Sequence, residues 1–349
     1  MFTCMKAHLI YIGILSLLLF SCSPSAEEEQ LTFGFIDKTG ALVIDGGYKI
    51  SGSFSQGLSW AIDNNQLRGY IDKSGEFVIP AQFEIAGYFH EGMAWVVKLG
   101  KRGYIDMDGK LIIDPIYDYV EDFHEGLARV LINGKKWGYI NKMGEYAIQP
   151  RYDACGDFYN GYATVKENGL AGVIDKSGLY VIEPTYDELG SFTDSLAYVK
   201  VDGKFGYINL KNEFIIEPTY DFASDFHDGR AMVQLGTKFG YVGITGNVEV
   251  SIKYDKAGIY HDGVARVKTG TKTEYIDRDG VSLFDFIYES GSDFYDGLAW
   301  VYQDEKFGYV DKTGKLIIKL RYIEAEDFHE GYARVRYKKS DLAELNTTN

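Results

Sequence analysis

The chain has 349 residues, a net charge of −15, 46% hydrophobic and 15% aromatic residues, and only six prolines. This composition is that of a packed globular protein, and it excludes an intrinsically disordered chain. The acidic balance argues against nucleic acid and anionic lipid surfaces as partners, because both carry negative charge themselves.

The first residues are typical of an export signal, which we assign to residues 1–21. Lys6 supplies a positive charge, residues 9–20 form a mostly apolar run, and the sequence Leu19-Phe20-Ser21-Cys22 follows. This run is too short to cross a hydrocarbon layer of about 30 Å as a helix. The last four residues resemble the lipobox of bacterial lipoproteins, whose cysteine is lipidated. The resemblance implies a lipid anchor at Cys22 and a cell-envelope location, which we expect to be the outer membrane, on its periplasmic or its surface face.

Residues 22–32 form a short polar tether between this anchor and the rest of the chain. Its glutamates, residues 27–29, resemble the acidic stretch that directs some lipoproteins to the cell surface, or they serve as a solvated spacer. After the signal and Cys22, the sequence contains only Cys155. An intramolecular disulfide framework is therefore excluded.

A glycine recurs every 34 or 35 residues and predicts nine equal units over residues 33–337, before a tail of residues 338–349. A second glycine column runs in register with the first, from Gly57 to Gly331. Such units fold only when each packs on its neighbours. The first column comprises Gly34, Gly69, Gly103, Gly138, Gly172, Gly206, Gly240 and Gly308, with Glu274 in the remaining position.

Each unit predicts a three-stranded antiparallel meander followed by a connector of about ten residues, with no helix. In one unit, Ala128 and Val130 are two residues apart and therefore lie on the same face of a strand. Asp-Lys-Ser-Gly, as at residues 72–75, fits a tight hairpin because the Asp bonds its own backbone and the Gly accepts positive φ. A proline such as Pro80 is expected to end the third strand, because it lacks the N–H that pairing requires.

The two ends of the array leave its topology open. The chain enters by a strand near residues 33–37 and leaves after a strand near residues 332–336. These strands would close a β-propeller if they paired. Propellers, however, usually have four to eight blades of four strands. We therefore expect an open, solenoid-like superhelical array, with a closed β-propeller as the alternative.

The repeated motifs resemble the bacterial WG repeat. They include Trp-Gly-Tyr-Ile-Asn at residues 137–141, Phe-Gly-Tyr-Ile-Asn at 205–209 and Phe-Gly-Tyr-Val-Asp at 307–311. The match covers residues 33–336, although only Trp137 is a tryptophan at the position before the glycine. The others are Phe, Arg, Ala or Thr. The resemblance implies an all-β repeat domain whose biochemical activity is largely unassigned.

Two further patterns are better explained by structure than by metal binding. Five histidines, residues 90, 124, 227, 261 and 329, occupy one repeat column. Successive units would hold them too far apart to share one ion, whose ligands lie about 2 Å away. Asp106 and Asp277 begin calcium-like segments that lack the terminal Glu. We expect connector turns and hairpins, and neither a metal nor a cofactor.

The variable residue of the Ala-x-Val motif is our candidate binding site. Ala and Val hardly change, as expected of a core face, whereas x points to the opposite face and holds three of the four tryptophans. Trp, Tyr and Arg are enriched at binding hot spots. The competing explanation is that connector segments cover this face. The candidates are Trp60, Trp95, Arg129, Tyr198, Arg266, Trp300 and Arg334, and Thr164 and Met232 complete the column.

No nucleophile with its base, phosphate loop or paired carboxylate stands out from the repeats. We therefore expect a non-enzymatic scaffold that binds a protein, peptide or glycan and touches the membrane only through its lipid. A structural spacer or assembly factor without a single ligand is the alternative. An enzyme of an unrecognised type is the third hypothesis.

Overall fold

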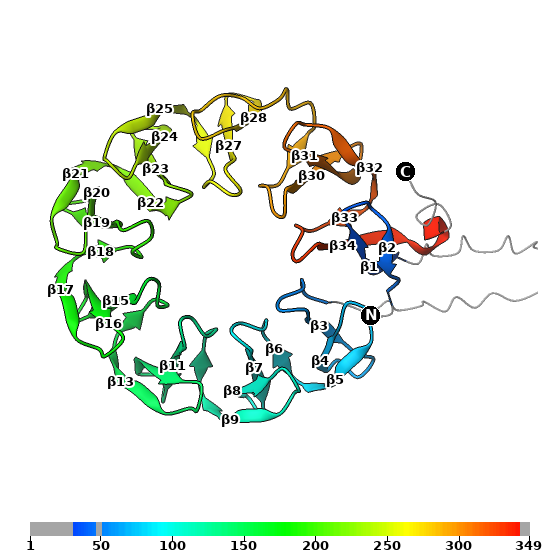
Figure 1. The fold of residues 1–349 in the computed structure, drawn as a ribbon, viewed down its shortest axis with the longest axis horizontal. Coiled ribbons are helices and arrows are strands. Elements are labelled where there is room, and N and C mark those ends of the chain that lie inside the picture. Colours follow the sequence, from blue (N-terminus) through cyan, green and yellow to red (C-terminus); the bar gives the residue numbers. More distant parts are fainter. Residues whose placement is uncertain (1–30, 47–50, 343–349) are drawn as a thin grey trace, which may run out of the picture.

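Nine small antiparallel sheets stand side by side in a closed ring, so the protein is a nine-bladed β-propeller (Figure 1). The computed structural model describes residues 31–46 and 51–342. Regular structure in these ranges is all strand, apart from one 3-10 helix, η1 (Lys339–Asp341). The prediction of an all-β fold with nine units is confirmed. The predicted signal, Cys22 and all but the last two residues of the tether lie outside the described residues.

Each complete blade has four strands, one more than the sequence predicted. In Figure 1, β22 (Phe222–His227), β23 (Arg230–Leu235), β24 (Lys238–Gly243) and β25 (Val248–Tyr254) follow one another from the inner to the outer rim of the ring. The inner strand lies in the segment that was expected to be a connector. In most blades it has only two residues.

The other blades, apart from the one that closes the ring, are also built from short strands. In chain order they are β3 (Ser59–Ile62), β4 (Arg68–Ile71) and β5 (Phe77–Phe83); β6 (Ile85–Ala86), β7 (Met93–Lys98), β8 (Lys101–Asp106) and β9 (Leu111–Tyr117); β10 (Tyr119–Val120), β11 (Leu127–Ile132), β12 (Lys136–Asn141) and β13 (Tyr146–Tyr152); β14 (Ala154–Cys155), β15 (Tyr162–Glu167), β16 (Leu170–Asp175) and β17 (Tyr180–Tyr186); β18 (Glu188–Leu189), β19 (Ala197–Val201), β20 (Lys204–Ile208) and β21 (Phe214–Tyr220); β26 (Lys256–Ala257), β27 (Ala265–Thr269) and β28 (Lys272–Ile276); and β29 (Ser290–Gly291), β30 (Leu298–Gln303), β31 (Lys306–Asp311) and β32 (Leu316–Tyr322).

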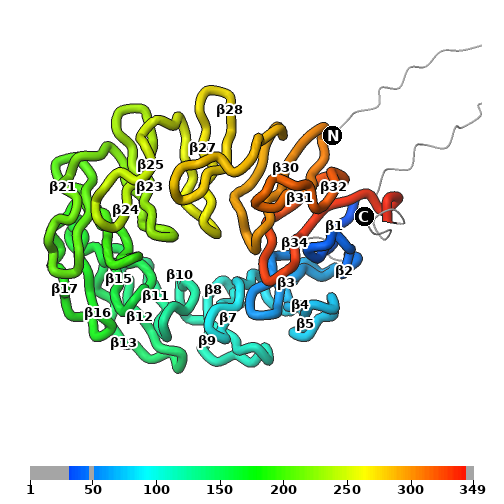
Figure 2. The backbone as a smooth tube through the Cα atoms, turned by 45° about the horizontal axis from the view of Figure 1, so that its top comes forward, coloured from blue at the N-terminus to red at the C-terminus, as the bar shows by residue number. Residues whose placement is uncertain are grey.

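The ring is closed by a blade that contains both ends of the described chain. β1 (Leu31–Asp37) pairs along its whole length with β34 (Tyr332–Lys338), from Leu31 opposite Lys338 to Asp37 opposite Tyr332. β2 (Leu42–Ile44) flanks β1, and β33 (Glu324–Ala325) flanks β34. Figure 2 shows these strands together between the first and last parts of the ring.

The open superhelical array, our first expectation, is therefore wrong, and the closed propeller that was its alternative is correct. The error arose from the strand count. Three-stranded units do not match propeller blades, whereas seven of the nine sheets that the described residues form have the usual four strands, although nine blades exceed the usual four to eight. The missing inner strand is too short to show any alternation in the sequence.

The Asp-x-x-Gly hairpins form as predicted. Asp72 Oδ1 accepts hydrogen bonds from the backbone N–H of Ser74 at 2.8 Å and of Glu76 at 3.3 Å. Gly75 has φ of +87°, a conformation that residues with a Cβ avoid. The calcium-like aspartates Asp106 and Asp277 accept the same bonds from residues 108 and 110 and from residues 279 and 281. Both segments are hairpin turns.

The first glycine column marks a close approach between the outer strand and its neighbour. A Cβ on Gly69 would lie 2.4 Å from the carbonyl oxygen of Ile79. The register shifts at the same place, so residues 80–82 bulge opposite Gly69. Pro80 therefore lies inside β5, not at its end as predicted. Its missing N–H is tolerated because β5 is an edge strand with a bulge.

Glu274, the exception in that column, lies in an irregular blade. β26, β27 and β28 form a three-stranded sheet, and no regular outer strand follows them. The Leu283 N–H still donates to the Tyr275 carbonyl at 2.8 Å, and the rings of Phe284 and Phe286 pack on Tyr275. At the equivalent Gly69 and Gly103, a Cβ would lie 2.4 and 2.3 Å from a carbonyl oxygen of the outer strand, so a side chain at position 274 is incompatible with that regular crossing.

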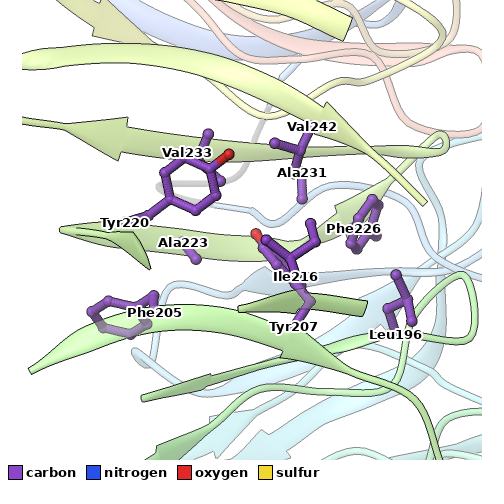
Figure 3. Close-up of a cluster of buried hydrophobic side chains, with 10 residues drawn as sticks. All are labelled: Leu196, Phe205, Tyr207, Ile216, Tyr220, Ala223, Phe226, Ala231, Val233 and Val242. Atoms are coloured by element: carbon purple, nitrogen blue, oxygen red, sulfur yellow. The ribbon is translucent and has the colours of Figure 1, made fainter. Parts of the chain in front are cut away.

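The hydrophobic core lies between neighbouring blades. In Figure 3, Phe205 and Tyr207 of one blade face Phe226 and Val233 of the next. Tyr207 and Val233 are completely buried, and the Tyr207 hydroxyl donates to the Ser224 carbonyl of the adjacent blade at 2.9 Å. Equivalent clusters recur around the ring. Each sheet is therefore covered on both faces.

Carboxylates in the tight turns before the second strands also link neighbouring blades. Glu91 Oε2 accepts the N–H of Gly126 in the next blade at 2.9 Å, and Lys142 Nζ lies 3.2 Å from the same oxygen. Glu330 accepts the N–H of Gly57 at 2.9 Å and so connects the last repeat to the first. The equivalent pairs are Glu125 with Gly161, Asp194 with Gly229, Asp228 with Gly263, Asp262 with Gly297, and Asp296 with Gly331.

Among the described residues, no helix has the length and apolar character needed to cross a membrane.

Removing β34 should destabilise the whole ring more than removal of one interface would. A chain that ends at Lys319 loses the partner of β1 and the bond from Glu330 to Gly57, so two blades become exposed at once. We expect a large fall in the denaturation midpoint, measured by circular dichroism in urea. A chain ending at Lys338 keeps β34 and is the control. A fall in the denaturation midpoint no larger than that expected from losing one blade of an open array would contradict the closed ring.

Candidate functional site

The candidate Trp/Arg column lies between blades, where each side chain faces the next blade. Trp95 is half-buried against a cluster that contains Val120 and Phe123 of that blade. Its neighbours Ala94 and Val96 pack on the opposite face, against Phe89 and Tyr70. The predicted division between an Ala/Val face and an x face is confirmed, and both faces are covered.

The residue eight positions before x adapts to the side chain at x. A Cβ on Gly87 would lie 2.3 Å from Nε1 of Trp95, and one on Gly52 would lie 2.4 Å from Nε1 of Trp60. A side chain at either of these two glycines would collide with the indole, whereas beside Trp300 the same place is taken by Ser292, whose hydroxyl accepts the Trp300 backbone N–H at 3.1 Å. Where x is arginine, an acid can take this place. Arg334 forms an ion pair with Glu326, as Arg129 does with Glu121 at 3.8 Å.

All seven candidate side chains are half-buried, and none projects freely from a blade. Trp60, Tyr198 and Trp300 pack against apolar clusters. The arginines are held by carboxylates: Arg129 Nε lies 2.9 Å from Asp157, and Arg266 Nε lies 3.2 Å from Asp293. Their part in binding remains a prediction. Their positions between blades give them a structural part as well.

The position before the first glycine column fills the space beside this x residue. The Trp137 ring lies 5.7 Å from the Tyr119 ring, and Arg129 stacks on it. The Phe307 ring lies 5.3 Å from Trp300 and 4.9 Å from Tyr302. Arg102 takes the same place in another blade, 4.0 Å from the Tyr119 ring centroid. A large side chain thus plugs the gap between two blades.

Ala171 and Thr273 are small residues at this position, and each lines a pocket. The first pocket, of about 240 Å³, lies between the blade of β14 to β17 and that of β18 to β21. The second, of about 210 Å³, lies at the equivalent place beside β26 to β28. Both are lined by the same repeat positions, since Thr164, Lys166 and Ala171 correspond to Arg266, Lys268 and Thr273.

The first pocket has an apolar floor and a polar edge. Val165, Ala171 and Leu189 are buried, whereas Asp187 and Glu188 are exposed. The Thr164 hydroxyl donates to the Gly190 carbonyl at 2.9 Å, so it is already satisfied. Burial raises the pKa of the Cys155 thiol to about 12, so this lining group stays protonated at neutral pH and is a poor nucleophile.

The second pocket is more basic. Lys256, Arg266 and Lys268 all line it, and Arg266 is paired with Asp293. Arg266 and Tyr198 are members of the candidate column that line these pockets. Ala171 and Thr273 were not among the residues predicted from the sequence. The signal was present, because these are the two small residues in a column of Phe, Arg and Trp.

The histidine column forms part of a chain of rings from blade to blade. His90 and His124 have ring centroids 5.8 Å apart, and His124 lies 5.4 Å from Tyr159. His90 Nε2 is 3.3 Å from Asp122 Oδ2. In the part of the chain that the structure describes, no group of three or more His, Cys, Asp or Glu side chains is arranged to hold a metal ion.

Asp225 gives this inter-blade region a measurable pH dependence. Burial raises its pKa to about 6, although Oδ1 accepts the Ser191 N–H at 2.9 Å. The unfolded carboxyl would titrate near 3.9. Between about pH 4 and about pH 6, the native state therefore binds more protons than the unfolded state. The stability that this group contributes is complete below about pH 4 and is lost as the pH rises through about 6.

We expect Asp225→Asn to raise the free energy of unfolding by roughly 2 kcal/mol at pH 7.5 and to bring little gain at pH 4, because the amide stays neutral. Urea denaturation at both pH values measures this difference. Asp114→Asn, at an exposed carboxylate, is the control. An equal effect of Asp225→Asn at the two pH values would contradict the assignment.

Comparison with solved structures supports the propeller fold. A structure described as the crystal structure of the eukaryotic initiation factor matches with a TM-score of 0.57 and 11% identity, over 82% of this chain and 95% of that chain. BamB from Moraxella catarrhalis matches with a TM-score of 0.41 and 10% identity, over 89% and 98%. YCF48 bound to D1 peptide gives 0.34 and 13%, over 68% and 93%. At these identities, only the first match carries weight, and it concerns the fold alone.

No curated protein matches the chain in sequence. The WG containing repeat matches nine segments, which begin at residue 33 and end at residue 339. They are residues 33–66, 69–101, 103–135, 137–170, 172–205, 205–238, 239–272, 275–307 and 307–339. Because these segments cover most of the chain and follow the register of its blades, the protein belongs to the WG containing repeat family.

Proposed function

We propose that this protein is a non-enzymatic binding scaffold of the bacterial cell envelope, which holds a protein, peptide or glycan in pockets between its blades. The observation that carries this proposal is the pair of pockets at Ala171 and Thr273. They occupy equivalent places in two blades, and ligand sites are typically concave and largely apolar with a few polar groups.

Several features favour binding over catalysis. Tyr198 and Arg266, which line the pockets, are residue types enriched at binding hot spots. The one free thiol among the described residues, Cys155, is protonated at neutral pH because burial raises its pKa. The carboxylates that recur around the ring hold neighbouring blades together. An enzyme of unrecognised type remains the less favoured hypothesis.

The scaffold is proposed to be anchored through a lipid on Cys22. Residues 23–30 separate this cysteine from β1, and eight residues reach at most about 30 Å when fully extended. Because β1 pairs with β34, the anchor would hold the ring close to the membrane at its closing blade. The outer membrane, on its periplasmic or its surface face, is the location we propose.

Filling both pockets should abolish ligand binding. We expect the full chain carrying Ala171→Phe and Thr273→Phe to capture peptides or glycans from an immobilised library at least about tenfold more weakly than the unchanged chain. Thr219→Phe adds the same ring at an exposed position of β21 and is the matched control. If no ligand binds even to the unchanged chain, the structural spacer becomes the better explanation.

Cys22→Ala should release the protein from the membrane fraction, because the lipid attached to this cysteine is the only membrane anchor in this proposal. Fractionation of cells, followed by a salt wash and immunoblotting, measures this release. Membrane pelleting of the variant at the level of the unchanged protein would rule out the lipid anchor.

A further inference from the structure

We propose that the pocket at Ala171 receives one aromatic ring, the side chain of a tryptophan or phenylalanine in a bound peptide. This inference rests on the proposed binding function and specifies the ligand of one of its two pockets. The chain's other blades show what normally occupies the same place.

Four repeat positions surround the ring that fills this place elsewhere. Trp137 contacts Tyr119 and Arg129, which correspond to Ala154 and Thr164. Phe307 contacts Tyr302, which corresponds to Lys166. Phe205 contacts Phe222 of the next blade, 6.1 Å away, which corresponds to Glu188. All four corresponding residues, Ala154, Thr164, Lys166 and Glu188, line the pocket at Ala171.

The pocket is therefore the space left by a missing large side chain between two regular blades. A Trp or Phe ring fits the equivalent space in the blades of Trp137, Phe205 and Phe307 without disturbing their four strands. With a volume of about 240 Å³, the cavity is smaller than the roughly 300–1,000 Å³ of drug-sized sites. It suits one ring, not a larger ligand.

Ala171 differs from Thr273 in a way that favours the first pocket. Thr273 precedes Glu274 in the blade that lacks a regular outer strand, so its pocket accompanies a general departure from the repeat. Ala171 precedes Gly172 in a blade with all four strands, β14 to β17. Nothing in the local fold requires the large side chain to be absent there.

The lining also matches an aromatic residue that belongs to a peptide. The buried Val165, Ala171 and Leu189 offer apolar contact to the ring, and the half-buried Tyr198 offers an aromatic neighbour. Asp187 and Glu188 are exposed lining residues whose carboxylates can accept hydrogen bonds from peptide N–H groups. A ring carried by a peptide can use both parts of the site.

The test compares two capped tripeptides, Gly-Trp-Gly and Gly-Leu-Gly, titrated into the full chain and followed by NMR or calorimetry. We expect the tryptophan peptide to bind at least about tenfold more tightly. Ala171→Phe should abolish this binding while the melting temperature stays the same or rises, because the new ring fills the cavity as Phe205 does in the next blade. Equal binding of the two peptides, or unchanged binding by a folded Ala171→Phe variant, would overturn the proposal.

A second variant protects the test if Ala171→Phe fails to fold. Thr164→Trp places an indole at the x position, above Gly156, as Trp95 lies above Gly87, and should block the pocket from its other side. Thr273→Phe fills the second pocket alone and should leave the affinity within about twofold. In another outcome, the tryptophan peptide does not bind, but the unchanged chain captures another ligand that the variant with both Ala171→Phe and Thr273→Phe does not capture. That result would overturn this inference and leave the scaffold proposal standing. Binding of free indole as tightly as the tryptophan peptide would also overturn it, because the peptide N–H groups would then contribute nothing.

Discussion

Every sheet in this protein must be covered on both faces, and the rest of the structure follows from that constraint. The face with Ala94 and Val96 packs on the blade before it, and the face with Trp95 packs on the blade after it. In an open array the first and last sheets would each expose one apolar face. The pairing of β1 with β34 removes both exposed faces by making the two ends one blade.

Close packing between blades explains why the repeat keeps its glycines and its polar turns. A side chain at Gly69 or Gly103 would collide with the outer strand, and the blade that carries Glu274 lacks a regular one. The carboxylates that accept Gly N–H groups of the next blade fix the spacing between turns. The repeat therefore encodes contacts between blades more than contacts within them.

The sequence predicted the repeat, the Asp-x-x-Gly hairpins and the alternation of Ala-x-Val, because each depends on local chemistry that recurs nine times. It did not predict ring closure or the inner strand. Two residues such as Tyr119 and Val120 have no periodicity to read, and the pairing of Leu31 with Lys338 joins positions at opposite ends of the described chain. The bulge that places Pro80 inside β5 was also invisible, because it depends on the approach of Gly69.

The candidate site was harder to predict, because in a repeat protein the absence of a side chain is as informative as its presence. The tryptophans of the x column attracted attention as large and variable residues, yet the structure packs them between blades. Ala171 carried less weight in the sequence, since a small residue suggests no chemistry. In the neighbouring blades, Trp137 and Phe205 fill the equivalent space. Comparison with them shows that the small side chain of Ala171 leaves a pocket there. In a closed ring of equal units, such a departure confined to one regular blade distinguishes a candidate ligand site from the packing that every blade shares.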